Sequence, residues 1–302
     1  MLAGLWVSSS TRGVKPSAAA PSTRMVCRPL PARRHNERLI ARALGGRPDQ
    51  AVLATKFGIV RDAGGVRVDG DPGHVRGYCE ASLGRLGTDV IDLYYLHRID
   101  PAVPVADTVG AMAELVAEGK VRHLGLSEAT PDQLEQASAV HPIAAVQHEW
   151  SLLWRGPEDD VVPAARRLGT GIVCYSPLGR GLLTSTLTQA TIAGSDFRRG
   201  DPRFNGADLD RNLGQVEVLR GIAAELEITP GQLALAWLLA QGPDVVPIPG
   251  SRHAERIAEN ASAAAVRLSP ADLRRLEEAV PRGAWSGDRT SFAAAVTARE
   301  PG

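Results

Sequence analysis

The sequence predicts an α/β protein whose parallel strands close into a barrel. From Asn36 onward, short apolar runs alternate with amphipathic stretches of helical length, and six such strand–helix units follow residue 50. Strands that are apolar on both faces are typical of parallel sheets covered by helices. A doubly wound open sheet shares this alternation, but no GxGxxG turn follows an early strand, and its absence favours the barrel.

The expected elements follow one another along the chain with mostly short connections. The expected strands cover residues 51–56, 89–96, 121–126, 143–147, 171–175 and 244–248. The expected helices cover residues 36–45, 72–87, 106–119, 131–140, 157–168, 214–226, 230–241, 252–264 and 269–279. Thr130, Thr229 and Ser269 each precede a proline and stand three residues before a Gln or Asp, a pattern that predicts a capped helix start.

Composition excludes several classes of partner. The 302 residues include 34 Lys or Arg and 34 Asp or Glu, so no net field attracts nucleic acid or a membrane surface. No apolar run reaches the roughly 20 residues that a membrane helix needs. The three cysteines, Cys27, Cys79 and Cys174, form neither a disulfide framework nor a metal-binding spacing. A cytoplasmic protein without a metal site is therefore expected.

Residues 1–35 differ from the rest of the chain. They contain no Asp or Glu, six Lys or Arg, and four prolines, and no helical or strand period persists in them. We expect this segment to be atypical and disordered. Residues 36–302 are expected to form the barrel domain and a C-terminal tail.

Polar and aromatic residues end the predicted strands. Successive strands end at Lys56, His97, Ser127, Gln147 and Tyr175. Each alone is more often structural than functional. In an α/β barrel, however, the carboxyl ends of the strands all meet at one face, where active sites are built. Together these residues predict a reaction site or a cofactor groove, with Lys56 and His97 facing one shared site.

The turn after the last strand has the character of an anion site. Gly250 and Ser251 precede a predicted helix, whose N-terminal N–H groups favour an anion, and Arg252 and Arg256 add guanidinium forks suited to phosphate. An ordinary serine-capped surface helix would show the same pattern. A phosphate here, with Tyr175 able to stack on a flat ring, indicates a nicotinamide nucleotide across the barrel mouth.

Five segments together resemble the aldo-keto reductase family. They are ATKFG (54–58), IDLYYLHR (91–98), GKVRHLGLSE (119–128), YSPLGRGLL (175–183) and IPGSR…RIAEN (248–260). The resemblance runs from about His35 to about residue 290. It implies a (β/α)8 TIM barrel that transfers hydride between NADPH and an aldehyde or ketone.

The resemblance also implies roles for individual residues. Lys56 and His97 match the catalytic lysine and histidine, Ser127 and Gln147 match the residues that hold the carboxamide, and Tyr175 matches the residue that stacks on nicotinamide. The pyrophosphate and adenosine contacts are matched by Ser176, Leu178, Gly181, Gly250, Ser251, Arg252, Arg256, Glu259 and Asn260. The two arginines favour NADPH over NADH, because the extra 2′-phosphate suits a guanidinium.

The sequence departs from the family ahead of Lys56. The family's catalytic aspartate and tyrosine precede the helix matched by residues 36–45, whereas the four tyrosines here are Tyr78, Tyr94, Tyr95 and Tyr175. The only aspartate before Lys56 is Asp49, which follows that helix. The barrel is therefore expected to lack its first two strands or to hold degenerate ones, and Lys56 to lack its carboxylate partner.

Three explanations are compatible with this start. An organelle transit peptide would explain the composition of residues 1–35 but not the loss of two strands. A true truncation and a misread frame joined to an authentic gene near His35 are favoured equally. In the second case, another frame of the upstream DNA would encode an Asp and a Tyr.

Three functions follow from these expectations. The leading one is an NADPH-dependent oxidoreductase with impaired activity toward a small-molecule carbonyl. The alternatives are a non-catalytic NADP-binding regulatory subunit on the same scaffold and a non-folding product of a damaged gene. No sequence feature specifies an oligomeric state.

Overall fold

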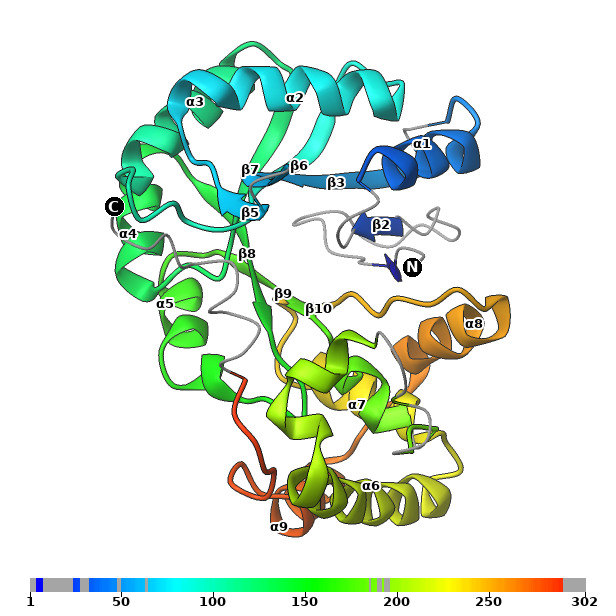
Figure 1. Cartoon of the computed structure of the whole chain (residues 1–302). Coiled ribbons are helices and arrows are strands. Elements are labelled where there is room, and N and C mark those ends of the chain that lie inside the picture. Colours follow the sequence, from blue (N-terminus) through cyan, green and yellow to red (C-terminus); the bar gives the residue numbers. More distant parts are fainter. Residues whose placement is uncertain are drawn as a thin grey trace.

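Six parallel strands form a curled sheet with helices on its outer side (Figure 1). The computed structural model describes residues 4–7, 24–27, 33–47, 50–62, 65–184, 186–188, 192 and 196–289. The parallel strands, in spatial order, are β3 (Ala51–Phe57), β6 (Ile91–Leu96), β7 (Val121–Ser127), β8 (Ile143–Glu149), β9 (Gly171–Tyr175) and β10 (Val245–Pro247). All six coincide with predicted strands within two residues at each end, so the predicted alternation is confirmed.

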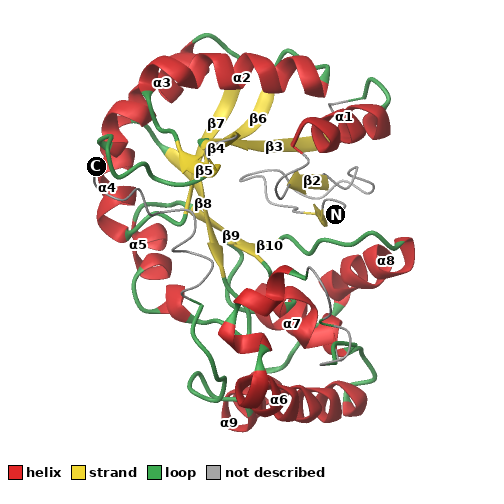
Figure 2. Cartoon of the chain, in the orientation of Figure 1, coloured by secondary structure: helices red, strands yellow, loops and turns green. Residues whose placement is uncertain are grey.

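Helices alternate with these strands along the chain (Figure 2). They are α1 (Arg33–Leu44), α2 (Pro72–Leu86), α3 (Val105–Ala117), α4 (Pro131–Val140), α5 (Val161–Arg167), α6 (Gly206–Glu225), α7 (Pro230–Leu239), α8 (Ala254–Ser262) and α9 (Pro270–Ala279). Thr130, Thr229 and Ser269 each make the predicted reciprocal capping box. The helix expected over 157–168 is instead a short 3₁₀ turn, Gly156–Glu158, followed by α5, which the carboxylate of Asp160 caps.

The first edge of the sheet departs from the pattern of a regular barrel. Strands β1 (Gly4–Val7) and β2 (Arg24–Cys27) pair antiparallel, and β2 then pairs parallel with β3. Among the described residues β10 pairs only with β9, so no ladder joins β10 to β1. These observations agree with an α/β barrel whose first two strands are degenerate. Both strands lie inside residues 1–35, and most of that segment falls outside the described residues.

A small hairpin was not predicted. Strands β4 (Ile59–Asp62) and β5 (Gly65–Val68) pair antiparallel directly after β3. The predicted strand ends at Lys56, and no element is predicted between it and the helix that starts at residue 72. Four-residue strands carry too little periodicity to be recognised, especially when charged residues alternate with the valines, as in Gly65–Val68.

Two apolar layers lie on the two faces of the parallel sheet. The outer layer packs strands against helices, for example through Val109, Met112 and Leu115 of α3. The inner layer is the barrel interior, and it consists of Ala54, Leu93, Tyr95, Ala145 and Val173, with Val246 and Ile248 against them. Gly125 gives Tyr95 its space, because a Cβ at Gly125 would lie 2.4 Å from the Tyr95 ring.

Candidate active site

The interior layer determines which strand-end residues face the site. Side chains along a strand alternate between faces, so the residue two positions beyond an interior residue faces the interior again. Lys56, Gln147 and Tyr175 follow the interior residues Ala54, Ala145 and Val173 in this way. The carboxyl ends of these strands lie at the same edge of the sheet, so the predicted convergence of these residues is supported by register.

Lys56 and His97 lie on neighbouring strands at this edge. Lys56 is in register with Tyr95, and its Nζ lies 5.3 Å from the centroid of the Tyr95 ring. The backbone N–H of His97 donates to the carbonyl of Phe57 at 2.9 Å, which extends the ladder between β3 and β6 by one step. The buried ring of Tyr95 therefore lies next to Lys56 and, two residues before His97, on the same face of the sheet.

Ser127 and Gln147 lie directly opposite each other. They are partners in the β7–β8 ladder, and both are almost fully buried. The guanidinium of Arg98, itself buried, donates to Ser127 Oγ at 3.2 Å and to the carbonyl of His97 at 3.0 Å. Ser127 and Gln147 therefore place a hydroxyl and an amide side by side at the mouth of the barrel.

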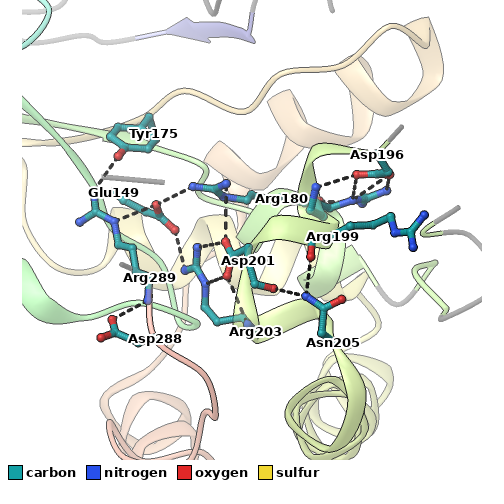
Figure 3. A network of polar contacts seen from close by, with 11 residues as sticks. Glu149, Tyr175, Arg180, Asp196, Arg199, Asp201, Arg203, Asn205, Asp288 and Arg289 are labelled. Atoms are coloured by element: carbon teal, nitrogen blue, oxygen red, sulfur yellow. Dashed lines mark hydrogen bonds and ion pairs between the residues drawn. The ribbon is translucent and has the colours of Figure 1, made fainter. Parts of the chain in front are cut away.

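Tyr175 is held by its hydroxyl. Arg289 Nη2 donates to Tyr175 Oη at 2.9 Å, and Arg289 lies 3.2 Å from Glu149 (Figure 3). Arg289 also binds the carboxylate of Glu128. Burial, together with the carboxylates of Glu128 and Glu149, raises the pKa of the Tyr175 phenol, so the phenol stays protonated. Because the phenol is neutral, the carboxylates of Glu128 and Glu149 are the negative charges that face the Arg289 guanidinium.

The loop after β9 is wound tightly by local hydrogen bonds. Gly179 N–H donates to Ser176 O, and Gly181 N–H donates to Leu178 O. Ser176 adopts a left-handed conformation with φ of 50°, and Gly181 has φ of 97°. The predicted cofactor residues Ser176, Leu178 and Gly181 therefore share one compact turn.

Two of the residues predicted to contact the pyrophosphate and adenosine, Leu178 and Glu259, lie beside the start of α7. Gly231 brings Leu178 and Glu259 together, because a Cβ there would lie 3.8 Å from Leu178 Cδ2 and 3.6 Å from Glu259 Oε1. Glu259 accepts from Thr229 Oγ1 at 2.5 Å. Asn260, next to it on α8, is partly exposed.

The turn at Gly250 and Ser251 differs from the prediction in one respect. The helix was expected to begin at residue 252, with a serine-capped start as the alternative to an anion site, but α8 begins at Ala254 with His253 at its N-cap and no side-chain cap. Ser251 Oγ instead accepts from His253 N–H at 3.1 Å, so it orders the turn before the helix. The turn still adjoins Tyr175, because Ile248 N–H donates to Cys174 O at 3.0 Å.

Comparison with known proteins assigns the family. The model of the aldo/keto reductase family matches residues 32–281. The chain belongs to the aldo/keto reductase family.

Curated and solved relatives agree with this assignment. A protein of Glycine max named probable aldo-keto reductase 1 is 47% identical over 256 residues, which are 84% of this chain and 74% of the relative. A glycerol dehydrogenase from Gluconobacter oxydans has a similar structure, with a TM-score of 0.78 and 28% identity over 85% of this chain and 80% of that one. A thermostable aldo-keto reductase solved with the inhibitor epalrestat gives a TM-score of 0.63 and 28% identity over 81% and 77% of the two chains.

Membership makes the chain an oxidoreductase of a family that generally uses NAD(P)H and acts on small carbonyl compounds. Within the described part of the chain, no helix is both long and apolar enough to cross a membrane. Likewise, His, Cys, Asp and Glu side chains form no metal-binding group of three or more among the described residues.

A buried ion network that the sequence did not predict lies beside the candidate site. Glu149 is fully buried and lies within ion-pair distance of Arg180, Arg203 and Arg289. Asp201 binds Arg203 at 2.7 Å and lies 3.6 Å from Arg180, and Figure 3 shows these side chains in one continuous cluster. Arg180 also has a left-handed φ of 56°. Arginines in polar loops are usually surface residues, so they gave no signal of the cluster. The only signal was the presence of Glu128 and Glu149 at the carboxyl ends of two site strands.

Because of Glu128, the free energy of unfolding is expected to fall as the pH drops below about 4.5. Burial would raise the pKa of the Glu128 carboxyl, but His148, Arg289 and Arg98 outweigh burial and lower that pKa from 4.5 to about 2. The unfolded chain therefore binds the proton first as pH falls. The carboxylate contributes ~3 kcal/mol to folding above pH 4.5, and this contribution disappears as pH falls through about 2. In urea unfolding, Glu128→Gln should lower stability at pH 7 by a similar amount and flatten its decline below pH 4.5.

Glu135→Gln is the matched control for this prediction. Glu135 is half-exposed and pairs with Arg167 on the surface, where such pairs contribute about 0–1 kcal/mol. An acid dependence of Glu128→Gln as steep as that of the wild type would contradict the prediction.

Proposed function

We propose that this chain binds NADPH at the mouth of its barrel and reduces a small aldehyde or ketone slowly, with Lys56 and His97 as its catalytic residues. The observation that carries the proposal is the alignment of Lys56, Gln147 and Tyr175 along the interior edge, with His97 and Ser127 beside them. When bound, the nucleotide would supply the hydride.

The residues present fit a nicotinamide ring. Ser127 Oγ and the Gln147 amide are neighbours in register, and together they offer the donors and acceptor that a carboxamide needs. The Tyr175 ring ends the adjoining strand, and its hydroxyl is fixed by Arg289, so the ring is held as a stacking surface. These residues therefore support binding and orientation of the ring at the strand ends.

Arg252 and Arg256 support the preference for NADPH. Both side chains are exposed, and neither makes an ion pair with any residue that the structure describes, unlike most arginines near the site. Two unpaired guanidiniums four residues apart, at the start of α8, suit a phosphate group.

Replacement of either arginine by glutamine should therefore weaken NADPH more than NADH. A charge-assisted hydrogen bond contributes about 1.5–3 kcal/mol, so we expect roughly a tenfold or greater rise in the Kd of NADPH and little change for NADH. Fluorescence titration with both nucleotides measures this. Arg267→Gln is the control, since Arg267 donates to the carbonyl of Ala264, beyond the C-terminal end of α8. Equal weakening of the two nucleotides would contradict the assigned preference.

Proton delivery is the weak step of the proposed reaction. In the family a tyrosine protonates the nascent alkoxide, and no tyrosine precedes Lys56 in this sequence. Loss of a general acid typically lowers a rate by about 10²–10⁴. We propose that His97 delivers the proton through a water molecule and that Lys56 stabilises the developing negative charge. The same absence favours the alternative of an NADP-binding subunit without turnover.

Two measurements test the proposal. NADPH fluorescence on titration tests binding, and no change would overturn the proposed function. NADPH consumption with glyceraldehyde, chosen because a similar structure is a glycerol dehydrogenase, then separates slow turnover from none. Binding without any consumption would favour the regulatory subunit, and turnover at rates ordinary for enzymes, about 1–10³ per second, would contradict the impaired proton step.

A cytoplasmic location is part of the proposal. Cys79 and Cys174 are free and buried, as expected in a reducing compartment. Burial raises the pKa of the Cys79 thiol to about 11, so the thiol is unreactive at neutral pH.

A further inference from the structure

Arg289 links two turns that come from different strands of the barrel. Its guanidinium binds the carboxylate of Glu128, directly after β7, and the hydroxyl of Tyr175, the last residue of β9. The same group lies 3.2 Å from Glu149 and 5.4 Å from the centroid of the Trp154 ring. Only 12% of the Arg289 side chain is exposed, so these contacts are shielded from solvent.

Both linked turns are strained. Glu128 has φ of 57° and Ser176 has φ of 50°, a left-handed conformation that side chains other than glycine adopt at a cost of about 1–3 kcal/mol each. Glu128 directly follows Ser127, and Ser176 directly follows Tyr175. Such a conformation persists only where surrounding contacts hold it. The strained residues therefore set the direction of the two side chains proposed to meet the nicotinamide.

Contacts of the C-terminal segment place Arg289 between the two turns. Asn212 holds the backbone of Ser286 in both directions, accepting from its N–H at 2.8 Å and donating to its carbonyl at 2.9 Å. Gly287 follows with φ of 85°, and a Cβ there would lie 2.6 Å from the backbone nitrogen of Arg203. Only glycine permits this approach, which turns the chain inward two residues before Arg289.

The other members of the ion network cannot replace Arg289 at these two turns. Glu149 has Arg180 and Arg203 as further partners, and its charge stays compensated without Arg289. For Glu128, the remaining cationic neighbours are Arg98 and the buried imidazole of His148, whose pKa burial lowers. Arg289 is the described residue whose hydrogen bonds join Glu128 to Tyr175.

We propose that Arg289 is a positioning residue that holds the turns after β7 and β9, so that Ser127 and Tyr175 face the nicotinamide half of the cofactor. This inference rests on the proposed function and adds a residue outside the strand-end set. Arg289 contacts neither the reacting atoms nor the adenosine end. Loss of Arg289 should therefore weaken the binding of the nicotinamide half of the nucleotide and leave the binding of the adenosine half unchanged.

The test compares NADPH with adenosine 2′,5′-bisphosphate, which carries the adenosine half without the nicotinamide. Arg289→Met is expected to raise the Kd of NADPH about tenfold and to leave that of the bisphosphate within about twofold. Arg289→Lys keeps the charge but not the fork, so it should recover only part of the affinity. Arg282→Met, in the same C-terminal segment and paired with Asp159 on the surface, should bind both ligands like the wild type.

Amide hydrogen exchange without nucleotide supplies a second measurement. The amide of Glu128 donates to the carbonyl of Gln147 on β8, and that of Gly179 to the carbonyl of Ser176. Both amides should exchange faster in Arg289→Met and at the wild-type rate in Arg282→Met. Equal weakening of both ligands, or unchanged exchange with unchanged affinity, would overturn the role of Arg289 while leaving the proposed function intact. A wild-type protein that binds the bisphosphate and NADPH equally weakly, or binds neither, would overturn the proposed function itself.

Discussion

An Arg203→Met variant is expected to lose about 3–5 kcal/mol of unfolding free energy, because it leaves buried carboxylates without their main partner. Arg203 is 1% exposed, and it donates to Asp201 at 2.7 and 3.0 Å and to Glu149 at 2.8 Å. Burial opposes its charge, but the hydrogen bonds that it donates to Asp201 and the charges of both carboxylates raise the pKa of Arg203 above the ordinary value. Methionine retains the apolar stem and most of the volume of arginine, so the lost free energy reflects mainly the missing charge and hydrogen bonds.

Urea unfolding measures this loss, with Arg275→Met as the matched control. Arg275 pairs with Glu225 through both Nη atoms, but the pair is half-exposed, so solvent screens it and its loss should change stability far less. Similar losses in the two variants would show that the buried network stabilises the fold no more than a surface pair does. The double variant Glu149→Gln, Arg203→Met should recover part of the lost stability, because it removes the carboxylate together with its partner.

The strands and most helices of this reductase could be predicted because their signals are local. Apolar runs set the parallel strands, and a hydroxyl, a proline and an amide or carboxylate within four residues set the starts of α4, α7 and α9. Once the interior layer is known, alternation along each strand also determines which side chains face the interior. Lys56, Gln147 and Tyr175 follow from it, because a residue's face depends only on its own strand.

The ion network could not be predicted because its signals are not local. Glu149 and Arg203 are 54 residues apart, and Glu128 and Arg289 are 161 apart. A charged residue in a loop reads as a surface residue until the partner that makes its burial tolerable is known. The same limit applies to Ser251, whose hydroxyl suits a helix cap by sequence but orders the turn that leads to His253, the residue at the cap position.

Replacing His97 by alanine is expected to lower the rate of NADPH-dependent aldehyde reduction by about 10²–10⁴, with the Kd of NADPH within about twofold of the wild type. His97 lies at the end of β6, beside Lys56 and above the buried Tyr95 ring, at the strand ends where the proposed reaction takes place. The side chains proposed to bind the nicotinamide come from the later strands β7, β8 and β9. A proton-delivery role therefore predicts a loss of rate without a loss of binding.

His123→Ala is the matched control, because His123 lies on the neighbouring strand β7, in register with Leu93 and exposed, four residues before the strand end at Ser127. Its removal should leave both rate and affinity unchanged. Added imidazole buffer should restore part of the rate of His97→Ala in proportion to its concentration, because a small free acid can occupy the vacated space and donate the proton. A rate for His97→Ala equal to that of the wild type, or a loss that imidazole cannot restore together with a weakened NADPH complex, would assign His97 to the framework of the strand ends rather than to proton transfer.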